Sequence, residues 1–126
     1  MSVQSQAAVA TCLAFALCAC QTAGPVENPD EAYAMSTRLA ETIGRCWFAD
    51  GDQRLAAYNY SPERNANQSR VLIVRRSDQT GLPALVVEPK NRATVNVYGS
   101  LLATAEGNRL RTDIDRWVTG GTECAG

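Results

Sequence analysis

Five cysteines are the residues of this chain with the most reactive chemistry, and their spacing divides them into two groups. Cys12, Cys18 and Cys20 lie close together near the N-terminus, whereas Cys46 and Cys124 stand far apart. Thiolates bind metals, pair as disulfides or act as nucleophiles. The chain contains no histidine, which removes a common zinc ligand and the base that most often activates a thiol. We therefore predict no metal site, no cofactor and no catalytic residue.

The first three cysteines lie in an apolar N-terminal segment that carries no charged residue before Glu27. The run from Ala7 to Cys20 is too short for a membrane-spanning helix, which needs about 20 residues. Its length and its small-residue ending are typical of a secretory signal peptide. A buried N-terminal helix, in which cysteine serves as a small apolar residue, is the alternative interpretation.

The end of this segment, Leu17-Cys18-Ala19-Cys20, resembles the lipobox of bacterial lipoproteins. That pattern is an aliphatic residue, two small residues and the cysteine that receives the lipid. The resemblance implies that residues 1–19 are a signal peptide and that Cys20 carries the lipid anchor. Gln21 stands where an aspartate is associated with inner-membrane retention, which implies an outer-membrane, periplasm-facing location. A signal peptide cleaved without lipidation is the alternative.

Processing at this point leaves residues 20–28 as a short tether and residues 29–126 as a single domain. Once Cys20 is lipidated, the two remaining thiols lie in an oxidising compartment. We predict a disulfide between Cys46 and Cys124, with two buried free cysteines as the alternative. The bridge would close a loop of about 79 residues, worth roughly 4–4.5 kcal/mol in the chain-entropy model.

The expected secondary structure begins and ends with a helix. Asn28, Pro29 and Glu31 suit an N-cap, a first helical position and a capping box, and apolar residues at intervals of three or four predict a helix from about 29 to 46. Apolar runs bounded by turn residues predict strands at 70–76, 84–88 and 93–98, with a weaker first strand at 54–60 and a polar loop at 61–69. A second helix is expected over 100–118, with Gly107 weakening its middle and Gly120-Gly121 ending it.

This order predicts an α+β domain, in which an antiparallel meander of three to four strands lies between an N-terminal and a C-terminal helix. Because strand 70–76 is apolar on both faces, we expect it to be central in the sheet. The C-terminal helix is expected to pack on one sheet face. Trp47, Phe48 and Trp117 are expected in the core.

A few polar and aromatic residues are candidates for binding or catalysis. We predict that Asp50-Gly51-Asp52 forms a turn. An EF-hand calcium loop that began at Asp50 would need a glutamate at its twelfth position, and that position is Ser61. Asp113 and Asp115 are two positions apart on a helix and point to different sides, so they form no dyad. Tyr58 and Tyr60 share one strand face and, with Arg64, form a possible partner surface, although a half-buried sheet face explains the tyrosines equally well.

A net charge of −1 does not favour nucleic acid as a partner. We expect a non-enzymatic lipoprotein that contacts the membrane through its lipid and binds another protein of the cell envelope. The alternative is a small envelope enzyme or an inhibitor of one. The order of elements is similar to that of the TonB and TolA C-terminal domains, a resemblance that implies binding by addition of a strand to a sheet edge.

Overall fold

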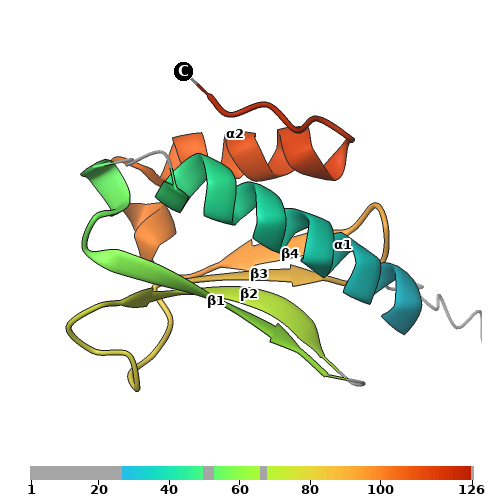
Figure 1. Ribbon diagram of the computed structural model, residues 1–126, viewed down its shortest axis with the longest axis horizontal. Helices are drawn as coiled ribbons and strands as arrows, with labels where there is room; N and C mark the ends of the chain where they lie inside the picture. The colour runs from blue at the N-terminus through green and yellow to red at the C-terminus, as the bar shows by residue number, and fades with distance from the viewer. Residues whose placement is uncertain (1–26, 50–52, 66–67, 126) are drawn as a thin grey trace, which may run out of the picture.

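A four-stranded antiparallel sheet forms one layer of the fold, and two helices lie on the same side of it (Figure 1). The structure is a computed structural model that describes residues 27–49, 53–65 and 68–125. The sheet order is β1-β2-β3-β4, so each strand pairs with its neighbour in sequence. The predicted α+β class with a meander sheet is confirmed. The elements are, in chain order, α1 (Pro29–Ile43), η1 (Gly44–Ala49), η2 (Gln53–Leu55), β1 (Tyr58–Arg64), β2 (Ser69–Arg75), β3 (Leu85–Pro89), β4 (Val95–Tyr98), η3 (Ser100–Ala103) and α2 (Gly107–Val118).

The start of α1 follows the predicted N-cap but not the full capping box. The Asn28 side chain accepts a hydrogen bond from the Glu31 backbone N–H at 3.2 Å, and Pro29 is the first helical residue. The Asn28 N–H, however, donates to the Lys90 carbonyl at 2.9 Å. The Glu31 carboxylate instead binds the Arg92 guanidinium, with contacts of 2.6 and 3.0 Å. The prediction that the Glu31 side chain binds the Asn28 N–H was therefore wrong, because a basic side chain from another turn competes for Glu31.

The first helical segment extends beyond the predicted end near residue 46. Its α-helical part ends at Ile43 and continues without interruption as the π-helical segment η1 to Ala49. The π-helical turn is a rare, wider form of helix. It brings Trp47 into the core at 1% exposure, while Cys46 is only partly buried. The apolar stripe of the helix is buried as predicted, including Met35 and Leu39.

The strands confirm the meander and correct the position of the first one. As predicted, β2 is central, because it pairs with β1 on one side and β3 on the other. The first strand, β1, covers residues 58–64, so the predicted strand at 54–60 began too early and the predicted loop at 61–69 was wrong for its first four residues. These residues are polar, yet they form a strand because their backbone pairs with β2 while their side chains lie at the edge of the sheet.

The predicted second helix is two separate segments, η3 and α2. Gly107 is the first residue of α2 rather than its middle, and it is buried. A Cβ atom at this position would collide with the Leu102 carbonyl, so the chain needs glycine to turn sharply between the two segments. Gly120 ends α2 with a φ of +109°, as the predicted glycine stop requires.

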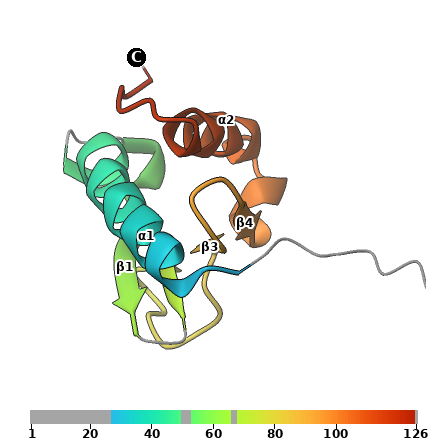
Figure 2. The ribbon, with the colours of Figure 1, turned by 90° about the vertical axis from the view of Figure 1, so that its right-hand side faces the viewer.

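Both helices lie on the same side of the sheet, as Figure 2 shows, but α1 is the one that packs extensively on its strands, so the expected packing of the C-terminal helix on a sheet face is not what the main contacts of α2 show. α1 lies over β1, β2 and β3, and α2 packs against α1 and η3. Trp47 and Trp117 meet in the core between the helices, with ring centroids 5.3 Å apart. Arg38 joins the helices by donating to the Trp117 carbonyl at 2.8 Å.

Candidate functional site

The predicted partner surface lies on β1, and the structure brings only part of it together. Tyr58 and Tyr60 share the face of β1 that points towards α1. Tyr60 is 38% exposed and stacks on Phe48, with ring centroids 5.1 Å apart. Tyr58 lies under the Arg75 guanidinium at 5.7 Å. Arg64 is exposed at the other end of the strand, about 20 Å from Tyr58 at the usual rise per residue, so it does not join the tyrosines.

The outer edge of β1 carries backbone groups that face away from β2. Just beyond the two ends of β1, odd-numbered residues bond to the β2 side. The Arg76 N–H donates to the Ala57 carbonyl at 2.9 Å, and the Asn65 N–H donates to the Gln68 carbonyl at 3.1 Å. Because bonding pairs alternate along an antiparallel ladder, the odd-numbered residues of β1 bond to β2. The even-numbered residues therefore direct their N–H and carbonyl groups outwards, where the Tyr58 carbonyl accepts from Arg76 Nε at 3.2 Å. Pro62 is one of these residues and has no N–H. An edge strand tolerates proline at such an outward-facing position, because no hydrogen bond to the neighbouring strand is lost.

The flank of α1 above this edge adds aromatic residues that the sequence interpretation missed. Gly44 faces β1, since a Cβ atom there would meet the Tyr60 hydroxyl at 2.5 Å. Tyr33 and Thr37 lie on the same flank of α1 by helical spacing, and Tyr33 is 50% exposed. Phe48 was expected in the core but is only half-buried beside Tyr60. What we call the edge surface is made of Tyr33, Phe48, Tyr58, Tyr60 and the outer edge of β1.

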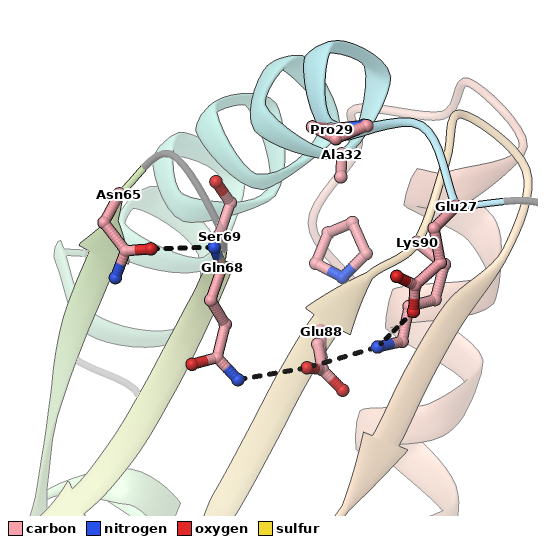
Figure 3. Close-up of a pocket in the computed structure, with 9 residues that line it drawn as sticks. Glu27, Pro29, Ala32, Asn65, Gln68, Ser69, Glu88 and Lys90 are labelled. Atoms are coloured by element: carbon pink, nitrogen blue, oxygen red, sulfur yellow. Dashed lines mark hydrogen bonds and ion pairs between the residues drawn. The ribbon is translucent and has the colours of Figure 1, made fainter.

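A second candidate is a small pocket between the start of α1 and the ends of β2 and β3 (Figure 3). Its volume is about 50 Å³. Glu88 accepts from the Gln68 side chain at 3.3 Å and pairs with Lys90 at 3.4 Å. Lys90 also pairs with Glu27 at 3.2 Å. The pocket therefore brings two carboxylates together around one ammonium group.

The chemistry of this pocket favours a structural role. The hydrogen bond to Glu27 is the main cause that raises the pKa of Lys90, with Glu88 adding to the effect. A raised pKa keeps the ammonium protonated at neutral pH, so Lys90 is a poor general base. The ammonium in turn holds both carboxylates as ion-pair partners. The arrangement connects residue 27 to the β3–β4 turn.

The structure joins Cys46 of η1 to Cys124 of the C-terminal tail, with the two Cα atoms 5.1 Å apart. Contacts other than the bond also hold the tail. Arg45 donates to the Thr122 carbonyl at 2.6 Å, and the Trp117 indole donates to the Glu123 carbonyl at 2.9 Å. The disulfide therefore crosslinks two segments that already dock on each other.

A third candidate lies beside the disulfide and centres on Asp113, which is 1% exposed. Its carboxylate accepts from the Trp47 indole at 2.9 Å and from Arg116 at 3.1 Å, and it pairs with Arg109 at 3.7 Å. Asp115 is exposed, so the two aspartates point to different sides as predicted. A buried carboxylate with these partners joins η1 to α2 and is a structural group.

The remaining predictions concern metals, membranes and the N-terminus. Among the described residues, no group of three or more His, Cys, Asp or Glu side chains is placed to hold a metal ion. No helix in the same residues is long and apolar enough to cross a membrane. Cys12, Cys18, Cys20 and the Asp50-Gly51-Asp52 turn lie outside the described residues.

No family model matches this chain, and neither a curated protein nor a solved structure matches it.

Proposed function

We propose that this protein is an outer-membrane lipoprotein that acts as a non-enzymatic adaptor. Its lipid at Cys20 anchors it in the outer membrane, facing the periplasm, and its folded domain binds another protein of the cell envelope. The lipobox-like stretch from Leu17 to Cys20 supports the anchor.

The pairing of the cysteines is the observation that carries this proposal. Loss of residues 1–19 would leave three cysteines, and two of them, Cys46 and Cys124, are bonded to each other in the structure. Cys20 is then the one cysteine of the mature chain without a thiol partner. A lipidated cysteine needs none, so lipidation at Cys20 accounts for the odd number. The disulfide also fits an oxidising compartment such as the periplasm.

The edge surface is the part of the domain that best suits an adaptor. An extended segment of a partner would pair with the outward backbone groups of β1 and pack its side chains against Tyr33 and Tyr60. Main-chain hydrogen bonds would supply affinity, and the aromatic side chains would supply apolar contact area. Neither the Lys90 pocket nor the Asp113 cluster offers an unpaired acid or base, which favours binding over catalysis.

Two measurements on the protein from its native membranes test the proposal. The intact mass is expected to show a chain that begins at an acylated Cys20, and a retained N-terminal segment would contradict the anchor. A photo-crosslinking residue replaces Tyr33 in the edge surface, and in a matched control it replaces Asn96 on β4, the opposite edge strand. We expect a crosslink to one envelope protein from position 33 and none from position 96. Equal yields from both positions, or none from either, would contradict binding at the edge surface.

Substitution of Arg64 separates backbone pairing from side-chain contact. Arg64→Pro removes one outward-facing N–H of β1 and spares the bonds to β2, much as Pro62 already does. Arg64→Ala removes the side chain but keeps the N–H. We expect the crosslink from position 33 to weaken in the proline variant and to persist in the alanine variant. If both variants crosslink as the parent does, strand addition at this edge is wrong.

A further inference from the structure

The β3–β4 turn fixes the point at which the tether leaves the domain. Lys90 binds residue 27 through its ammonium group at 3.2 Å and residue 28 through its carbonyl at 2.9 Å. Arg92 of the same turn binds Glu31 in the first turn of α1, with a shortest contact of 2.6 Å. The first residues of the domain are thus held against this turn by three contacts.

These contacts lie at one end of the elongated molecule. We call this the tether end: it comprises residues 27–31, the β3–β4 turn at 90–94, and the described residues 64, 65 and 68 at the tip of the β1–β2 hairpin. In Figure 1 these segments lie at the right, where the chain enters α1, and η1 and η3 lie at the left. The opposite end carries the Cys46–Cys124 disulfide. The 15 residues of α1 alone separate the two ends by about 22 Å.

We propose that the tether end faces the lipid headgroups and that the disulfide end points into the periplasm. This orientation rests on the lipid anchor at Cys20 proposed above. Residues 21–26 separate Cys20 from Glu27, and even a fully extended chain of that length reaches only about 25 Å. A random coil of the same length spans about 15 Å on average. Placing the disulfide end on the bilayer would require the whole extended length of the tether to run back along the body of the domain.

Tether length, rather than charge, would produce this orientation. The tether end carries three carboxylates and three cations: Glu27, Asp30 and Glu31 against Arg64, Lys90 and Arg92. A surface with this balance is not attracted to anionic headgroups. The orientation is therefore expected to persist at high ionic strength, where electrostatic docking on a membrane would be lost.

Paramagnetic relaxation in a membrane distinguishes the two ends. The isotope-labelled, acylated full-length product is placed in lipid nanodiscs that contain a gadolinium-chelating lipid. We expect the amide signals of Ala93 and Thr94 at the tether end to lose intensity, and those of Leu102 and Ala103 in η3 to remain. Equal loss at both ends, or a greater loss in η3, would overturn the proposal.

A lengthened tether is the matched control. Insertion of about 20 Gly and Ser residues between Val26 and Glu27 leaves the fold and the anchor intact but lets either end reach the membrane. We expect the difference between the two ends to disappear. If the difference persists, tether length is not its cause and the proposal fails. The intact mass separates this failure from that of the function: an unacylated product overturns both, whereas an acylated product with uniform signal loss overturns the orientation alone.

Discussion

Removal of the Cys46–Cys124 disulfide is expected to lower stability by an amount that follows from the loop it closes. The sequence separation is 78 residues, and a loop of this size corresponds to roughly 4.5 kcal/mol of lost denatured-state entropy at 25 °C. The native state itself should change little, because Arg45 and Trp117 hold the tail through carbonyls at Thr122 and Glu123. Since a domain of this size has about 5–15 kcal/mol of stability in total, the reduced protein should remain folded with a narrow margin.

Urea unfolding, followed by tryptophan fluorescence and far-ultraviolet circular dichroism, measures this loss. The protein in a non-thiol reductant is compared with the oxidised protein and with the variant carrying both Cys46→Ser and Cys124→Ser. We expect the free energy of unfolding to fall by about 3–4.5 kcal/mol in both crosslink-free forms. The slope with urea should rise slightly, because the denatured chain becomes more expanded. A loss below about 1 kcal/mol in reductant would refute the loop-entropy reasoning.

Three further predictions concern single residues. Asp113→Asn should cost roughly 2–4 kcal/mol in urea unfolding, because two arginines and an indole would face a neutral amide; an unchanged stability would contradict the role of the carboxylate. Gly107→Ala should cost about 1–3 kcal/mol in the same assay, because its Cβ would collide with the Leu102 carbonyl. The hydrogen bond from Arg92 lowers the pKa of Glu31 below its ordinary value of 4.5, so its stabilisation is complete above that pH and lost as pH falls. Glu31→Gln should flatten the acid limb of stability against pH, and an unaltered limb would contradict this assignment.

Local signals in the sequence were sufficient for the elements that depend on neighbouring residues. The N-cap at Asn28, the helix stop at Gly120 and the central strand β2 all follow from residue types within a few positions. The pairing of Cys46 with Cys124, 78 residues apart, was also predictable, because loss of residues 1–19 and lipidation of Cys20 would leave these two thiols. Each of these features has few competing alternatives, so the residue types alone predict it.

Features that depend on residues far away in the sequence could not be predicted from local patterns in the same way. Residues 61–64 are polar and contain Pro62, yet they pair with β2 as part of an edge strand. Glu31 suits a capping box, but Arg92 from the β3–β4 turn binds it instead. The predicted partner surface of Tyr58, Tyr60 and Arg64 was incomplete for the same reason, because Tyr33 is an ordinary exposed helix residue until the fold places its flank above β1. Helical spacing from Gly44 could have suggested this position, but only once Gly44 was known to face Tyr60.

The proposed orientation and the position of the edge surface together restrict where a partner can bind. Arg64 lies at the tether end and Tyr58 lies about 20 Å along β1 towards the disulfide end. A partner strand added to β1 would therefore run away from the headgroups rather than along them. With the tether end held within about 25 Å of the bilayer, such a strand would meet Tyr58 at most about 45 Å into the periplasm. The edge surface thus suits an extended partner segment that runs away from the membrane, or one that runs towards it, within this range of depth. A partner confined to greater depths could not reach it without a flexible extension of its own.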